Sequence, residues 1–192
     1  EKLLRKCEAC GAVLIVDECF LDFLPEGESL SAKRLLKTSK NLVILKAFTK
    51  LYGMAGVRLG YCLCADEDRL ARMQAAGQPW AVSSPAQAAG IAALDETEYV
   101  AQVRALIEAQ RPLLVQGLRV LGLRVIEGRA NYLLFRAPEA LGEALRRKGA
   151  VLRSCGNYPG LDASWYRTAV RTEKENRQLL ALLAETLPEV TR

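Results

Sequence analysis

Short apolar segments that alternate with helix-forming segments constrain the fold of this chain more than any other feature. Their length and composition favour strands buried on both faces, and they comprise Ala12–Val16, Asn41–Leu45 and Leu59–Ala65. A probable helical segment, Ser31–Lys37, separates the first two. Strands that alternate with helices indicate an α/β fold with a mostly parallel sheet.

The second half of the chain has a different pattern of predicted elements, with a long helix followed by short strands and helices. Asp66 and the Ser84-Pro85 pair are typical starts of two further helices, and a long amphipathic segment begins near Glu98. After Gly122 the elements become shorter. We expect strands at Leu123–Ile126, Tyr132–Phe135, Val151–Arg153 and Trp165–Val170, and helices at Pro138–Lys148 and after Thr172. These patterns predict one domain over residues 1–97, and a bridging helix with a small α+β domain over residues 98–192.

The composition and charge of the chain argue against a nucleic-acid-binding, membrane-spanning or secreted protein. The 192 residues are 51% hydrophobic, and the net charge of +5 is spread along the chain, which favours a solvated surface over a nucleic-acid-binding face. The apolar runs fall far below the ~20 residues of a membrane span, and no secretion signal opens the chain. We therefore expect a cytoplasmic protein that binds neither nucleic acid nor membrane.

Six cysteines and the absence of histidine limit the possible chemistry. Cys7 and Cys10 form the only CxxC pair, and no second pair completes a zinc site, so we predict no metal. Reduced thiols suit a cytoplasmic protein. A general base must then be a lysine, carboxylate, tyrosine or cysteine.

Three charged side chains lie at, or just beyond, the ends of the predicted strands. Asp17 ends the first strand, Lys50 follows the second, and Arg58 follows a glycine-containing stretch before the third. Ligands of open α/β sheets bind at such strand ends. Taken singly, each has an ordinary structural interpretation, as a turn aspartate, a surface lysine and an arginine in a surface ion pair. Together they supply an anion for a heterocyclic cation, an amine for an imine and a guanidinium for a phosphate.

The segments that carry these residues resemble motifs of a known family. Val16–Phe20, Thr49-Lys50 and Gly56–Tyr61 resemble the aspartate, lysine and arginine motifs of fold-type I enzymes that depend on pyridoxal 5'-phosphate. Within the class-II aminotransferase family they resemble the branch of the histidinol-phosphate aminotransferases and threonine-phosphate decarboxylases. Further segments with counterparts in this branch are Gln78–Val82, Gly128–Tyr132, Arg153–Tyr158 and Tyr166–Arg171.

The resemblance implies a role for each residue in a pyridoxal-phosphate site. Asp17 would pair with the ring nitrogen of the cofactor, and Lys50 would carry the cofactor as a Schiff base. Arg58 would bind the phosphate, and Thr49 would add a hydroxyl to it. The fold would be the C-terminal part of the large domain of such a transferase, followed by its small domain.

The resemblance also implies a small phosphorylated amino-acid substrate and a homodimer. Arg167 matches the family arginine that binds the substrate α-carboxylate. Arg171 is either a second substrate ligand or a surface residue before the last helix. For Asn131 and Asn157, which lie in matching motifs, a turn role is equally compatible.

Departures from the family pattern bear on the reaction. Phe20 stands where aminotransferases of this branch carry a tyrosine, a change that favours decarboxylation of L-threonine O-3-phosphate, a step of cobalamin synthesis, over amino transfer. Ala47 replaces a phosphate-binding Ser or Thr. The family's glycine-rich phosphate loop and asparagine-proline motif have no counterpart in these residues. A piece without activity of its own therefore remains a third hypothesis.

Overall fold

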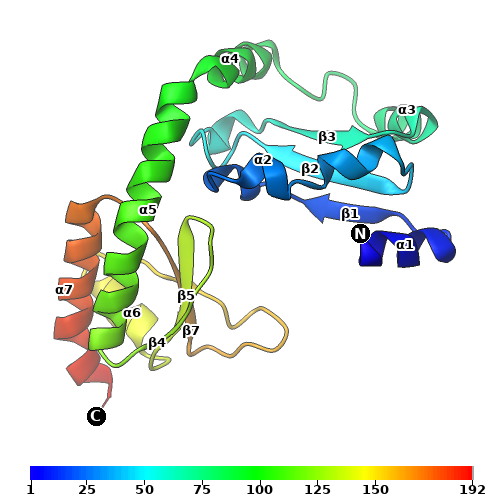
Figure 1. The fold of residues 1–192 in the computed structure, drawn as a ribbon. Helices are drawn as coiled ribbons and strands as arrows, with labels where there is room; N and C mark the ends of the chain where they lie inside the picture. Colours follow the sequence, from blue (N-terminus) through cyan, green and yellow to red (C-terminus); the bar gives the residue numbers. More distant parts are fainter. Residues whose placement is uncertain (192) are drawn as a thin grey trace. The chain divides into compact units, whose positions relative to one another are not determined.

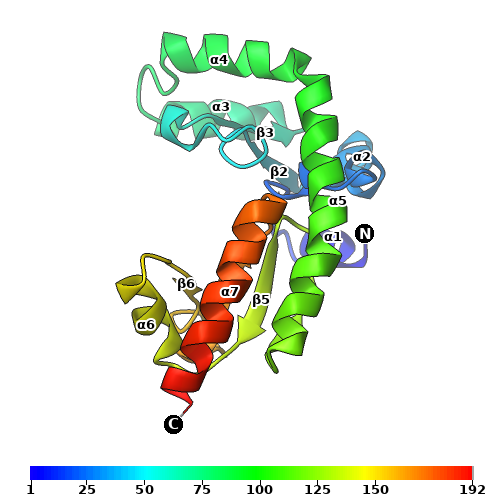
Figure 2. The same ribbon diagram turned by 90° about the vertical axis from the view of Figure 1, so that its left-hand side faces the viewer.

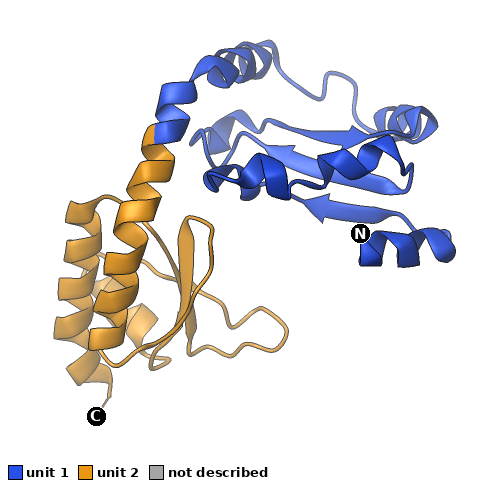
Figure 3. Ribbon diagram, viewed as in Figure 1, with its two compact units in different colours: residues 1–101 blue, residues 102–192 orange. Residues whose placement is uncertain are grey.

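The computed structural model describes residues 1–191, and the chain divides into two compact units, residues 1–101 and 102–192 (Figure 3). The long helix α5, Thr97–Val120, begins in the first unit and ends in the second (Figure 1). The boundary predicted at residues 97 and 98 lies at the start of this helix. The assignment of the two parts to a cofactor-binding domain and a small C-terminal domain remains a prediction.

Unit 1 contains a three-stranded sheet in the order β1-β2-β3. β1 (Leu14–Asp17) runs parallel to β2 (Leu42–Ala47), as expected. β3 (Gly60–Cys64) runs antiparallel to β2, so this sheet has one parallel and one antiparallel pair, where the sequence predicts a mostly parallel sheet. The reason lies in the connection, because the chain between β2 and β3 forms only the short 3-10 helix η3 (Ala55–Val57) and lacks the crossover helix that parallel neighbours need.

The helices of unit 1 are α1 (Lys2–Ala9), η1 (Leu21–Phe23), α2 (Gly27–Leu30), η2 (Ala32–Lys37), α3 (Glu67–Ala76) and α4 (Ser84–Asp95). Side-chain caps were expected for two of them, α3 and α4. Asp66 accepts a hydrogen bond from the Arg69 amide at the start of α3. The cap of α4 is Ser83 rather than Ser84, since the Ser83 hydroxyl accepts from the Ala86 amide.

The core of unit 1 lies on one face of its sheet. Leu42 and Ile44 of β2 are fully buried, and partly buried side chains of β1 and η2 pack against them. Side chains alternate between the faces of a strand, so Asp17, at the end of β1, belongs to the opposite and more exposed face. This arrangement leaves the Asp17 carboxylate at the solvent-accessible end of the sheet.

Unit 2 is a four-stranded antiparallel sheet with helices packed on it. The strands β4 (Arg124–Ile126), β5 (Tyr132–Arg136), β6 (Arg153–Ser154) and β7 (Trp165–Ala169) pair in the order β4-β5-β7-β6. The helices α6 (Leu141–Arg147) and α7 (Glu173–Val190) complete the unit, and α7 lies beside the second half of α5 (Figure 2). This confirms the predicted α+β character of this part.

A single apolar core joins these elements of unit 2. Leu114 and Leu118 of α5, Leu133 and Phe135 of β5 and Leu183 of α7 have no exposed surface. The predicted capping box at the start of α7 is confirmed, because the Thr172 hydroxyl and the Glu175 carboxylate each bind the other residue's backbone amide. Within residues 1–191, no helix is both long and apolar enough to cross a membrane.

Candidate cofactor site

Asp17 occupies the C-terminal end of β1, and its exposed carboxylate is held in one orientation. The backbone N–H of Cys19 donates to Asp17 Oδ1 at 2.9 Å, which closes a local turn. Hydrogen bonds from the Cys19 thiol and backbone, and then the nearby charge of Lys50, lower the pKa of Asp17 below its usual value. Asp17 is therefore a fixed anion at neutral pH, as a partner of a protonated ring nitrogen must be.

Lys50 follows β2 at the same edge of the sheet. β1 and β2 are parallel, and Asp17 pairs in register with Leu45, so the chain leaving β2 passes close to the end of β1. The exposed Lys50 ammonium lies 5.8 Å from the centroid of the Phe20 ring. Among residues 1–191 it forms no ion pair with a carboxylate. The structure thus brings Asp17, Phe20 and Lys50 together.

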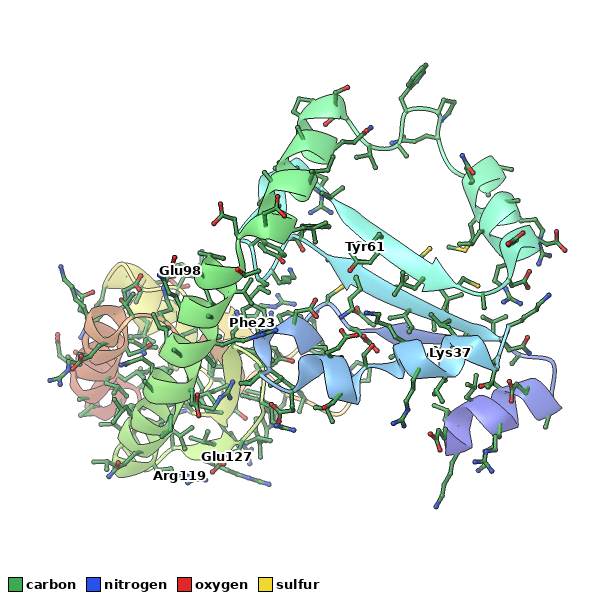
Figure 4. All side chains as sticks on the ribbon, turned by 45° about the horizontal axis from the view of Figure 1, so that its top comes forward. Phe23, Lys37, Tyr61, Glu98, Arg119 and Glu127 are labelled. Atoms are coloured by element: carbon green, nitrogen blue, oxygen red, sulfur yellow. The ribbon has the colours of Figure 1, made fainter. Side chains whose placement is uncertain are left out.

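Aromatic contacts within unit 1 hold the chain on both sides of Lys50. The buried Phe48 ring lies 5.4 Å from the Tyr52 ring and 5.9 Å from the Tyr61 ring. Figure 4 shows Tyr61 on β3. The Tyr99 hydroxyl donates to the backbone oxygen of Leu51 at 3.1 Å. Lys50 itself is exposed, so its amine is free to react while its backbone is anchored.

Arg58 lies just before β3, whose first residue pairs with the last residue of β2. The antiparallel direction of β3 therefore places its beginning at the edge where β2 ends. Arg58 adopts a left-handed backbone with φ of 58°, a conformation that costs a non-glycine residue about 1–2 kcal/mol. Its exposed guanidinium donates one hydrogen bond, from Nη1 to the Ala55 carbonyl at 3.3 Å. Thr49, partly buried, precedes Lys50 at this edge.

In unit 2, Arg167 lies on β7 directly opposite Arg153 on β6. Its guanidinium lies 4.8 Å from the Tyr132 ring centroid, and that of Arg153 lies 5.8 Å from the Tyr158 ring. Like charges on directly opposed residues repel each other. Within residues 1–191, neither guanidinium forms an ion pair with a carboxylate. Two adjacent cations without a protein anion are suited to bind an anionic ligand.

Unlike Arg167 and Arg153, Arg171 forms an ion pair with a carboxylate. Its Nη2 lies 2.6 Å from Glu175 Oε1 in an exposed ion pair, and its backbone N–H donates to Asn176 Oδ1 at 3.1 Å. These contacts agree with the surface interpretation that the sequence left open. Asn157 accepts a hydrogen bond from Arg153, and the backbone oxygen of Asn131 accepts one from Val170.

The sequence analysis did not identify two residues that contact the candidate site residues, one beside Asp17 and one opposite Arg167. Cys19 is one, and the signal that could have found it is its place two residues after Asp17, where its amide reaches the carboxylate. Arg153 is the other, and it becomes visible only through the pairing of β6 with β7.

The side chains of unit 1 fit pyridoxal phosphate in kind. An ionised carboxylate, an uncommitted amine and an exposed guanidinium face one sheet edge, and they match its ring nitrogen, aldehyde and phosphate. By contrast, no group of three or more potential metal ligands occurs within residues 1–191, and Cys7 and Cys10 are free thiols.

Cys19 should be a slow nucleophile for a partly exposed thiol. Burial, then hydrogen bonding to Asp17 and its charge, raise the pKa of Cys19 from 9.0 to about 11. Only the thiolate reacts, so at pH 8 its fraction is about one in a thousand rather than about one in ten. We expect iodoacetamide to label Cys19 far more slowly than the exposed Cys10, as measured by peptide mass spectrometry. Asp17→Asn should lower the pKa of Cys19 and speed its labelling. Equal rates in the two proteins would contradict the contact.

The chain matches the family model described as aminotransferase class I and II over residues 1–183. It is 36% identical over 191 residues to a threonine-phosphate decarboxylase of Salmonella typhimurium, covering 97% of this chain and 52% of that protein. It is also 36% identical over 182 residues to a histidinol-phosphate aminotransferase of Symbiobacterium thermophilum, covering 93% and 49%. The chain thus spans about half the length of the curated relatives it matches, and the identities do not separate the two activities.

Solved structures of the same two kinds of enzyme are also similar to this chain. A histidinol-phosphate aminotransferase from Clostridium acetobutylicum superimposes with a TM-score of 0.90 at 30% identity, over 98% of this chain and 58% of that one. The L-threonine-O-3-phosphate decarboxylase of Porphyromonas gingivalis gives 0.82 at 25% identity, with the same coverage. A histidinol-phosphate aminotransferase from Sinorhizobium meliloti, with a TM-score of 0.74 and 23% identity over 98% and 52%, was solved with pyridoxal-5'-phosphate. Homologues of this kind depend on that cofactor. The chain belongs to the aminotransferase class I and II family.

Proposed function

We propose that the complete polypeptide containing this chain decarboxylates L-threonine O-3-phosphate with pyridoxal phosphate. The observation that carries the choice is Phe20, which offers an apolar ring beside Lys50 where aminotransferases of this branch have a phenol. A phenylalanine gives no hydrogen bond to the cofactor's ring oxygen. The threonine-phosphate decarboxylase of S. typhimurium is among the relatives at 36% identity.

Each residue of unit 1 has a defined task in this proposal. When bound, the cofactor supplies a protonated ring that accepts the electron pair of the bond being broken. Asp17 holds the proton on the ring nitrogen, because its own pKa is low and its orientation is fixed by Cys19. Lys50 would hold the cofactor through its amine until the substrate amine takes its place, and would then return a proton to the α-carbon. Arg58 and Thr49 bind the cofactor phosphate.

The arginines of unit 2 suit a substrate with two anionic groups. We assign Arg167 to the α-carboxylate, and Arg153, directly opposite, to the substrate phosphate. The reaction breaks the bond between the α-carbon and the carboxylate, releases carbon dioxide and adds one proton to the α-carbon. The product is an aminopropanol phosphate. Arg171 is left to its surface ion pair with Glu175.

Carbon dioxide release tests the proposal. The complete enzyme with pyridoxal phosphate should release carbon dioxide from L-threonine O-3-phosphate in the absence of any 2-oxo acid. It should give no detectable amino transfer from histidinol phosphate to 2-oxoglutarate. Strict dependence of turnover on an amino acceptor would overturn the assignment.

Amino transfer is the second candidate function. One histidinol-phosphate aminotransferase superimposes on this chain with a TM-score of 0.90, and another is 36% identical to it, the same identity as the threonine-phosphate decarboxylase of S. typhimurium. It would use the same residues, but the α-hydrogen rather than the carboxylate would leave the α-carbon.

The third hypothesis is that the 192 residues alone are inactive. A visible absorbance band on adding pyridoxal phosphate to this chain would argue against that. The proposal includes a homodimer, which the resemblance implies, and a cytoplasmic location, which reduced thiols suit.

A further inference from the structure

Lys46 is a buried cation in the middle of unit 1, next to the candidate cofactor site but outside it. It is 6% exposed, and its Nζ lies 2.8 Å from Asp22 Oδ1 and 3.3 Å from Glu18 Oε2. Burial by itself would lower the pKa of Lys46, but the hydrogen bonds and charges of Asp22 and Glu18 raise it above its ordinary value. The ammonium is therefore a permanent charge.

Glu18 extends this cluster to a third part of the chain. It is 5% exposed, and its Oε2 accepts a hydrogen bond from the Ser31 hydroxyl at 2.8 Å. Its Oε1 accepts one from the Ala32 amide at 2.7 Å, at the start of η2. The carboxylate thus has partners on both oxygens, as a buried charge requires.

Glu18 and Asp22 lie at the two ends of one short turn, residues 18–22. A single ammonium, that of Lys46, binds both ends. Between these ends lie Cys19, whose amide holds the Asp17 carboxylate, and Phe20, whose ring lies beside Lys50. One side chain from β2 therefore links the two ends of this turn, in addition to the backbone hydrogen bond from Leu21 N–H to the Glu18 carbonyl at 3.0 Å.

Lys46 does not itself belong to the face that carries Asp17. Strand alternation puts Lys46 on the side of Leu42 and Ile44, which is the core side of the sheet. Glu18 follows Val16 on that same side, whereas Asp17 faces away from it. Lys46 can therefore act on Asp17 and Phe20 through the backbone of residues 18–22, in addition to its charge, which by itself lowers the pKa of Cys19.

We propose that Lys46 is a positioning residue that clamps the turn 18–22 through Glu18 and Asp22, and so fixes Asp17 and Phe20 around the cofactor. The proposal rests on the proposed function in one respect, the role of Asp17 and Lys50 in binding pyridoxal phosphate. The clamp itself is a property of the chain without cofactor, so it can be tested separately.

The test uses variants that open the clamp to different degrees. Asp22→Ala removes the acceptor at one end of the turn and leaves the Lys46–Glu18 pair intact, so we expect the variant to fold. Lys46→Met removes the clamp, and Lys46→Arg retains the charge as a rescue. Lys33→Met is the matched control, because Lys33 makes an exposed ion pair with Glu28 at 2.7 Å in the same unit. Circular dichroism checks that each variant is folded.

Two readouts are compared in the full chain. The first is the rate of Cys19 labelling by iodoacetamide without cofactor, and the second is the visible absorbance spectrum after adding pyridoxal phosphate. We expect about tenfold faster labelling in Asp22→Ala, since the hydrogen bond from the Lys46 ammonium to this residue is lost. We also expect a shifted or weaker band. Lys46→Arg and Lys33→Met should resemble the unmodified chain in both readouts.

The outcomes separate the two ideas. Unchanged Cys19 labelling in folded Asp22→Ala would overturn the clamp, whatever the spectrum shows. Faster labelling with an unchanged spectrum would overturn the link from the clamp to the cofactor. If the unmodified chain and the complete polypeptide both give no band, the proposed function fails, and the labelling rates alone then decide the clamp.

Discussion

Replacing Lys50 with alanine should abolish both the visible absorbance band with pyridoxal phosphate and the turnover of the complete enzyme. Lys50 supplies the amine that would hold the cofactor and the group that returns the proton. Positioned proton transfer alone contributes about 10²–10⁴-fold in rate. Loss of covalent attachment adds to this, so we expect at least about a 10³-fold fall in kcat. The measurement is kcat for carbon dioxide release, together with the spectrum.

A matched control separates chemistry from folding. Lys37 is an exposed lysine at the end of η2 in the same unit, and Lys37→Ala should leave the band and kcat unchanged. Because Lys50 is itself exposed, Lys50→Ala should alter the free energy of unfolding by no more than about 0.5 kcal/mol. Borohydride reduction of the loaded enzyme should attach the cofactor to the Lys50 peptide, as seen by mass spectrometry. Attachment to another lysine would refute the assignment.

The association of Asp17 with Lys50 follows from the sequence for a physical reason. Both residues come after short apolar segments, and parallel neighbouring strands end at the same edge of a sheet. Recognising the strands was therefore enough to predict that these side chains meet. Arg58 reaches the same edge for a different reason, because β3 is antiparallel and begins where β2 ends. Arg58 lies at the edge where the sequence places it, although β3 is an antiparallel exception in a sheet predicted to be mostly parallel.

Other features depend on pairings that no local pattern contains. Lys46 ends an apolar segment, where a lysine ordinarily marks a strand reaching solvent, and its burial depends on Glu18 and Asp22 from another part of the chain. Arg153 and Arg167 are separated by a loop, so their opposition is set by the register of β6 with β7. The ion pairs of Lys46 and the opposition of the two arginines join distant parts of the chain, so they become apparent only in the folded structure.

Arg167→Leu should lower kcat/KM for threonine phosphate by about 10²–10⁴-fold. A bidentate contact between a guanidinium and a carboxylate contains two charge-assisted hydrogen bonds, worth about 1.5–3 kcal/mol each. Arg167 forms no ion pair with a protein carboxylate within residues 1–191 and lies opposite another cation, Arg153. Removing its charge should therefore relieve the repulsion with Arg153, at the loss of the contact with the Tyr132 ring. Arg167→Lys should recover only part of the activity, because an ammonium cannot make the bidentate contact.

Arg171→Leu is the control four residues away, with the same change of side chain. Arg171 is already paired with Glu175 at 2.6 Å on the surface, so its loss should leave kcat/KM close to that of the unmodified enzyme. The spectrum with pyridoxal phosphate should be the same in both variants, since neither arginine is assigned to the cofactor. If Arg171→Leu lowered kcat/KM as much as Arg167→Leu, the substrate would be bound by Arg171 as well, and its ion pair with Glu175 would have to open during binding. If neither variant changed kcat/KM, the carboxylate-binding role of Arg167 would be wrong.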